Sequence, residues 1–258
     1  MRPIYISGNS PLHTLHPLTK LAAAVLLIVA ADMLPWPLVP LALCGVVFVL
    51  ALISGVARPL FRAALLLLLP FALSLFLIQG LLFPPAKTMP LTIGPITIWL
   101  DGLLFAGLIL ARLLVLTTTV LLLLQTTHPA DLALALTERG LPRSIGYVLL
   151  VALQLVPDMS ARATAILEAQ RARGLETRGL IRRVASLPPL VGPLIVGALL
   201  DVEERAMALE SRAFALAGPK TSLRTLVDST LQRAVRPLLL VLTVALIVAR
   251  FTILREGA

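Results

Sequence analysis

The chain has 258 residues, of which 59% are hydrophobic and 14% charged, and its mean hydropathy is +0.99. About a quarter of the residues of a soluble domain are charged, so this composition excludes a soluble protein and indicates an integral membrane protein. Continuous apolar runs, rather than short alternating segments, favour an all-α protein over a transmembrane barrel. The net charge of +9 fits the positive-inside rule as well as it fits a nucleic-acid partner.

Five nearly uncharged runs each approach the ~20 residues that a helix needs to cross the hydrocarbon core. We therefore expect about five transmembrane helices, at roughly 20–39, 40–57, 63–83, 102–124 and 237–254. The first two runs are divided by DMLPWP, whose prolines break a helix and whose Trp36 suits the membrane interface. A tight hairpin is therefore expected between them.

The segment between the third and fourth runs contains LTIGPITIWLDG, in which β-branched residues alternate around Gly94-Pro95. This pattern is typical of a small β-hairpin. Within the fourth run lies Arg112, a charge that is costly in a bilayer. We expect Arg112 to form a structural ion pair, with Asp32 or Asp101 as the candidate partner.

The basic residues are distributed unevenly along the chain. Fourteen of the 22 lie between residues 128 and 236, and Lys87 is the one in the long loop between the third and fourth runs. The positive-inside rule then places the N-terminus and segment 128–236 in the cytoplasm and Lys87 outside. We divide the chain into a membrane block of four spans (1–127), a cytoplasmic coupling-helix domain (128–236) and a C-terminal transmembrane helix (237–258).

Prolines and glycines in the cytoplasmic segment mark three helices. Its apolar runs IGYVLLVALQLVP and LPPLVGPLIVGALL are short of a full span, which favours long amphipathic helices at the membrane face. The expected helices run from about Pro129, capped by Thr127, to Arg139-Gly140; from Pro142 to Arg173, kinked at Pro157; and from about Pro188 or Pro189 to Ala217.

Alanines recur at three- and four-residue spacing on the two long helices, a pattern that lets helices approach closely. The expected helix-crossing positions are Ala161, Ala165, Ala169 and Ala206. Both helices finish in charge, as in EAQRARGLETRG (168–179). An arginine there can stabilise the carbonyl end of the helix by ~0.3–1 kcal/mol, or it can project into an acidic groove of another protein. Spacing alone leaves both possibilities open and favours the first.

These segments resemble the transmembrane T component of the energy-coupling factor (ECF) transporters, which import vitamins and metal ions. The resemblance covers nearly the whole length: SPLHTLHPLTKL, THPADLALALTERGLPRSIGYVLLVALQLVPDM, EAQRARG, and AMALESRAF followed by PKT. Its specific elements are the paired Ala-Arg-Gly-type motifs. Arg173 matches the first motif fully, whereas around Arg212 the residues Ser211 and Ala213 replace the family's commonest alanine and glycine.

The resemblance implies a noncatalytic subunit of the cell membrane. It implies two ATPase partners, contacted through Ala172, Arg173, Gly174, Ser211, Arg212 and Ala213, and a substrate-capturing membrane protein, the S component. No cofactor or metal site is expected. GPKT (218–221) lacks the upstream glycine of a phosphate-binding loop, because position 213 is alanine, so nucleotide is expected on the partners.

A membrane-embedded enzyme acting on a lipid-phosphate substrate is the alternative. Asp201 and Glu204 have the helical spacing to hold Mg²⁺, and His13 and His16 have ligand-like spacing. Neither pair has further ligands nearby in the sequence, and Arg205 adjoins the acidic one. A nucleic-acid partner is excluded because the basic residues alternate with acids and lack interleaved aromatics.

Overall fold

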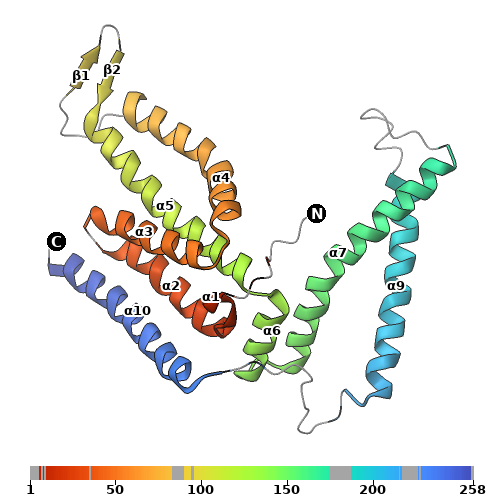
Figure 1. Cartoon of the computed structure of the whole chain (residues 1–258). Coiled ribbons are helices and arrows are strands. Elements are labelled where there is room, and N and C mark those ends of the chain that lie inside the picture. The colour runs from red at the N-terminus through yellow and green to blue at the C-terminus, as the bar shows by residue number, and fades with distance from the viewer. Residues whose placement is uncertain are drawn as a thin grey trace. The chain divides into compact units, whose positions relative to one another are not determined.

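The computed structural model describes residues 6, 8, 10–34, 36–82, 90–93, 96–174, 187–214, 216, 226 and 228–256. Lys87, Gly94-Pro95, Ala217 and the GPKT segment lie outside them. The regular structure of the described part is helical apart from one short β-hairpin. The prediction of an all-α membrane protein is therefore confirmed. The helices are α1 (Pro11–Thr14), α2 (Pro17–Met33), α3 (Leu38–Ile53), α4 (Ala57–Leu77) with the π-helical η1 (Ile78–Leu82), α5 (Leu100–Thr126), α6 (Pro129–Glu138), α7 (Arg143–Ala172), α9 (Leu187–Ser211) and α10 (Thr230–Glu256) (Figure 1).

The chain forms two compact units. One, the helix-pair unit, comprises Pro142–Thr225 and contains α7 and α9. The other, the bundle unit, comprises Arg2–Leu141 and Leu226–Ala258. Because α6 packs against α2 and the start of α10 lies along α2, both ends of segment 128–236 belong to the bundle unit. The helix-pair unit is thus shorter at both ends than the predicted cytoplasmic domain, 128–236.

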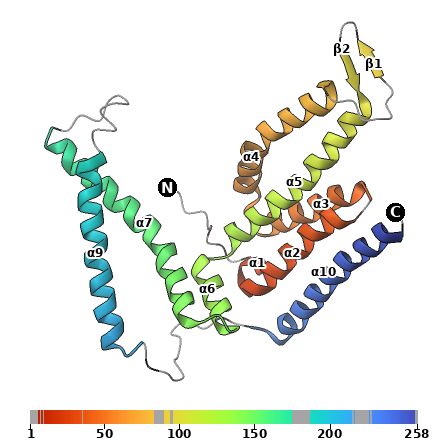
Figure 2. The same ribbon diagram turned by 180° about the vertical axis from the view of Figure 1, so that it is seen from behind.

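Helix α5 is the centre of the bundle unit, where it contacts α2, α3 and α4, while α10 lies alongside α2 (Figures 1 and 2). Its buried positions are mostly small or hydroxyl-bearing, such as Gly102, Ala106, Ala111 and Thr117–Thr119. Small side chains let neighbouring helices approach closely where no hydrophobic effect drives them together. A core cluster at one end of α5 joins Leu122 to Val47, Ala51, Val56 and Leu60.

Within the described ranges, four stretches are long and apolar enough to cross a membrane: Ala57–Gly80, Leu100–Thr126, Ser144–Ala172 and Thr230–Arg250. Three of them match predicted spans, and their outward side chains are large and apolar, as lipid contact requires. The first two predicted spans form the shorter helices α2 and α3, of 17 and 16 residues. The stretch in α7 exceeds the predicted 13-residue apolar run because the helix continues past Asp158 and Arg162.

Both predicted hairpins are present. Helices α2 and α3 are joined by a short connection in which the Trp36 side chain is 71% exposed. Strands β1 (Pro90–Ile93) and β2 (Ile96–Trp99) pair antiparallel, with Pro90 opposite Trp99 and Ile93 opposite Ile96. The sequence LTIGPITIWLDG therefore forms the β-hairpin that its alternation predicts.

The predicted ion pair of Arg112 is wrong. Among the described residues, Arg112 forms no ion pair with Asp32 or Asp101, and all three side chains are exposed. Asp101 is on the same helix about 17 Å along its axis, too far for a contact. Arg112 lies instead on an outward stripe of α5 with Leu116, Val120 and Leu124, because small residues and threonines occupy the packed face.

Candidate coupling site

Helix α7 ends as predicted, at Ala172, with Arg173 as its C-cap. The Arg173 backbone N–H donates to the carbonyls of Ala169 (3.3 Å) and Gln170 (3.1 Å), and the Gly174 N–H donates to that of Arg171 (3.0 Å). Gly174 has φ +90°, in the left-handed region that glycine adopts at little cost. The glycine after the arginine therefore ends the helix sharply and leaves the arginine at its tip.

Helix α9, the next helix described after α7, also ends at a residue in the left-handed region. The Ala213 N–H donates to the Glu210 carbonyl (2.9 Å) and the Phe214 N–H to the Leu209 carbonyl (3.0 Å), which together form a Schellman motif. Ala213 has φ +55°, an unfavourable conformation for a residue with a Cβ. The prediction that this helix runs to Ala217 is therefore wrong, because the left-handed residue ends it at Ser211.

A third arginine occupies an equivalent position. Arg139 is the C-cap of α6, Gly140 has φ +111°, and the Leu141 N–H donates to the Leu136 carbonyl at 3.2 Å. The predicted N-cap of α6, Thr127, is wrong. The N-cap is His128, whose ring accepts from the Ala130 N–H at 3.2 Å. Arg139 matches Arg173 and Arg212 in local geometry, so helix capping alone does not distinguish the three.

All six residues predicted to contact ATPases are exposed: Ala172, Arg173, Gly174, Ser211, Arg212 and Ala213. Neither Arg173 nor Arg212 forms an ion pair with another described residue.

Helices α7 and α9 pair antiparallel. The Arg162 Nη2 and Asp201 Oδ2 atoms form an ion pair at 2.7 Å, and the Tyr147 and Phe214 rings lie 5.4 Å apart between centroids. The start of α7 thus lies beside the end of α9, and the tips that carry Arg173 and Arg212 are at opposite ends of the pair. Because Asp201 is engaged by Arg162, the structure gives no support to the Mg²⁺ site proposed for the enzyme alternative.

The predicted helix-crossing alanines are not buried by this pairing. Ala161, Ala165, Ala169 and Ala206 are all exposed. The contact is made at neighbouring positions around the helices, where Arg162 reaches Asp201 and passes close to Gly197. The alanine stripe thus remains accessible, and a role in helix crossing stays a prediction.

One face of α9 is apolar and is exposed among the described residues. Five of its side chains are each more than half exposed: Ile195, Val196, Leu199, Leu200 and Val202. A continuous apolar surface of this kind on a helix pair indicates a hydrophobic partner or the membrane.

The bundle unit contains a buried polar cluster that was not predicted from the sequence. Arg236 in α10 is 6% exposed; its Nε donates to Thr19 Oγ1 of α2 at 2.8 Å, and its Nη2 donates to Asp228 Oδ1. The Asp228 carboxylate also accepts from Arg233 Nε at 3.2 Å. Burial would raise the pKa of Asp228, but the hydrogen bonds and charges of the arginines outweigh it and hold that pKa below its usual value.

His16 completes this cluster. Its ring Nδ1 accepts from the Leu18 N–H (3.3 Å) as the N-cap of α2, and its backbone N–H donates to Gln232 Oε1 of α10 (2.9 Å). Burial, and then the charge of Arg236, lower the pKa of His16. His13 is bonded to Ser10 Oγ (2.7 Å) and to the Ile6 carbonyl (3.0 Å). Both histidines of HTLH thus have local structural partners.

The signal for this cluster was present in the sequence. Asp228 lies eight residues before Arg236, and Arg236 directly precedes the last apolar run. Nothing near Arg236 in the sequence reveals its partner Thr19, which is 217 residues away along the chain.

Comparison with known proteins gives a consistent result. The family model described as "Cobalt transport protein" matches residues 8–223. The "Energy-coupling factor transporter transmembrane protein EcfT" of Thermosediminibacter oceani is 30% identical over 231 residues, 81% of this chain and 82% of the relative. That of Heliobacterium modesticaldum is 31% identical, covering 87% and 88%. The "Energy-coupling factor transporter transmembrane protein BioN" of Rhizobium etli is 30% identical, covering 82% and 96%. The chain therefore belongs to the family of ECF transporter transmembrane proteins, the T component that its motifs resemble.

Proposed function

We propose that this chain is the noncatalytic coupling subunit of an ECF-type importer in the cell membrane. In this role it passes the conformational change of two partner ATPases to an S component that captures a vitamin or a metal ion. The observation that carries the proposal is the pair of exposed arginine tips, alike in backbone geometry, at opposite ends of the antiparallel α7–α9 pair. Two separated cationic tips suit two similar ATPase subunits.

The mechanism requires a rigid connection between the tips. Helix α7 has 30 residues and is about 45 Å long, and the Arg162–Asp201 ion pair and the Tyr147–Phe214 contact join it to α9. When ATP binding closes the ATPases, their acidic grooves move, and the two tips move with them. Only partners that contact the tips differently in the two nucleotide states can drive such a shift.

The S component would rest on the surfaces that the helix pair leaves uncovered. The exposed apolar face of α9 and the alanine stripe of α7 can meet helices of a membrane protein through van der Waals contact. A tilt or slide of α7 and α9 would then reorient that protein in the bilayer. Substrate specificity would lie in the S component, and ATP hydrolysis in the ATPases.

The proposal assigns the N-terminus and segment 128–236 to the cytoplasm, on the basis of the fourteen basic residues in that segment. This orientation places both arginine tips on the side where ATP is available. It also places the loop that contains Lys87 outside the cell.

Charge reversal at the tips tests the proposal. The full chain, with Arg173→Glu and Arg212→Glu together, should retain far less of the co-expressed ATPase subunits on purification, because both tips would face like charge. Arg139→Glu is the matched control, since it reverses an arginine of the same cap geometry at the end of α6. Equal ATPase retention by the double variant, the control and the parental chain would leave capping as the only role of these arginines.

A further inference from the structure

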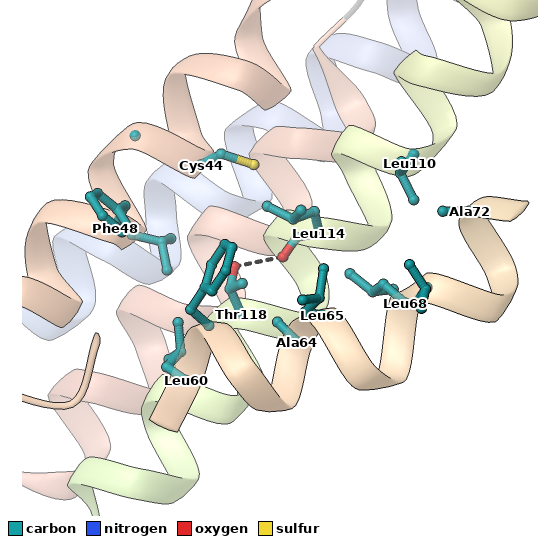
Figure 3. Close-up of a pocket in the computed structure, with 14 residues that line it drawn as sticks. Cys44, Phe48, Leu60, Ala64, Leu65, Leu68, Ala72, Leu110, Leu114 and Thr118 are labelled. Carbon is teal, nitrogen blue, oxygen red and sulfur yellow. Dashed lines mark hydrogen bonds between the residues drawn. The ribbon is translucent and has the colours of Figure 1, made fainter. Parts of the chain in front are cut away.

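The bundle unit contains a groove of about 410 Å³. Side chains from three helices point into it: Cys44 and Phe48 of α3, Leu65 and Leu68 of α4, and Leu114 of α5 (Figure 3). The hydroxyl of Thr118 also faces the groove but donates to the Leu114 carbonyl of its own helix. The lining therefore offers almost no free polar group and suits a hydrocarbon.

The groove has the length of one lipid chain. Its lining on α4 runs from Leu60 to Ala72, which is about 18 Å along the helix axis. Half of the hydrocarbon core of a bilayer is about 15 Å thick. A groove of this length that begins near the end of a spanning helix therefore covers about one leaflet.

Two arginines stand where the groove begins. Arg58 and Arg62 lie in the first two turns of α4, are exposed, and form no ion pair with another described residue. The lining residues Phe61 and Leu65 follow Arg58 by three and seven residues, and the lining residues Leu65 and Leu69 follow Arg62 by the same spacings. Both arginines therefore lie on the edge of the groove-lining face of α4.

Their position also lacks a compensating anion. The first turn of α4 contains no acidic residue, and its N-cap, Val56, offers no side-chain hydrogen bond. Cations at the N-terminus of a helix oppose its dipole, and an anion bound there would interact favourably with the arginines and with the free N–H groups. The two arginines and the apolar groove together fit a single molecule with an anionic head and a long apolar tail.

We propose that this groove binds an anionic phospholipid, with one acyl chain between α3, α4 and α5 and its phosphate against Arg58 and Arg62. The positive-inside orientation places these arginines at the cytoplasmic leaflet, where basic pockets between helices bind acidic lipids. The proposal does not depend on the coupling role, because it concerns the bundle unit alone.

Native mass spectrometry of the purified full chain tests this proposal. The delipidated chain is mixed with equal amounts of phosphatidylglycerol and phosphatidylcholine that carry identical acyl chains. One phosphatidylglycerol should be retained preferentially. Arg58→Gln with Arg62→Gln should lower the ratio of bound phosphatidylglycerol to bound phosphatidylcholine by about fivefold for each arginine. The matched control Arg139→Gln with Arg171→Gln, which removes two exposed arginines elsewhere, should leave the ratio unchanged.

A second pair of variants tests the tail. Ala72→Phe, which places a ring in the groove, should reduce the retention of both lipids, whereas Leu66→Phe, on the outward face of α4, should not. Circular dichroism would verify that all variants are helical. An unchanged phosphatidylglycerol preference in the double glutamine variant, or unchanged retention in Ala72→Phe, would overturn the proposal. So would a parental chain that retains neither lipid and instead loses thiol labelling of Cys44 when a membrane partner binds, since the groove would then be a protein interface.

Discussion

The backbone angle φ of Ala213 determines where helix α9 ends. A residue with a Cβ at φ +55° is strained relative to glycine, yet it holds Arg212 at the tip of α9. We expect Ala213→Gly to raise the free energy of unfolding by up to about 1 kcal/mol. Thermal unfolding of the purified chain would measure this, and Ala206→Gly, within the same helix, should instead destabilise by roughly 0.5–1 kcal/mol. A lower stability for Ala213→Gly would contradict the assigned strain.

His16 predicts a pH dependence of stability. Its pKa is lowered in the folded chain, so its neutral ring contributes stability that is present above the unfolded pKa of 6.5 and is lost as the pH falls through the folded value. Protonation would also put a proton on Nδ1 and remove the cap to the Leu18 N–H. Asp228, whose pKa is lowered from 3.8, loses its contribution only at lower pH.

The parental chain should therefore be less stable at about pH 5.5 than at about pH 7.5, and His16→Asn, which keeps a cap without a titrating ring, should reduce that difference. His13 and His128 line the same cavity and remain in both proteins, so the comparison isolates His16. Identical pH profiles for the two proteins would exclude His16 as the titrating group.

At the scale of elements, the buried Arg236 joins α10 to α2 through Thr19 and pairs with the half-buried Asp228 that precedes α10. Asp228→Asn would leave Arg236, which is 6% exposed, without its charge partner. Because Arg236 is buried and Asp228 half-buried, we expect this loss to cost more than the about 1 kcal/mol or less that losing an exposed pair costs. Arg233→Gln, at the exposed arginine of the same carboxylate, is the matched control. Equal unfolding free energies for both variants would show that the Arg236–Asp228 pair contributes no more stability than the exposed Arg233–Asp228 pair.

Features of the fold that depend on neighbouring residues were predicted better than contacts between residues far apart in the sequence. The end of α7 followed from Arg173-Gly174, and the β1–β2 hairpin from alternation around Gly94-Pro95, because neighbouring residues determine both. The end of α9 was missed because an alanine occupies a left-handed position that usually signals itself by glycine. The pairing of Arg112 was predicted wrongly and the partners of Arg236 were missed because the contacts of a charge on a helix depend on which face of that helix is packed.

At the scale of the whole molecule, the orientation in the membrane can be measured directly. In a Cys44→Ala background, a cysteine at position 87 should react with an impermeant thiol reagent in intact cells. A cysteine at position 139 should react only after permeabilisation, because the basic segment that contains it is assigned to the cytoplasm. The opposite labelling pattern would invert the topology and separate both arginine tips from the ATPases.

The coupling claim depends most directly on the affinity of the tips for the ATPases. The measurement is the dissociation constant of the nanodisc-reconstituted full chain for the ATPase pair, compared between the parental chain, Arg173→Lys with Arg212→Lys, and Arg139→Lys. Lysine keeps the charge that a helix end needs but loses the planar fork that binds a carboxylate through two bonds. We expect about tenfold weaker binding for the double variant, which is about 1.4 kcal/mol, and parental affinity for Arg139→Lys. Parental affinity in both variants would show that Arg173 and Arg212 are helix caps like Arg139 and would contradict the coupling assignment.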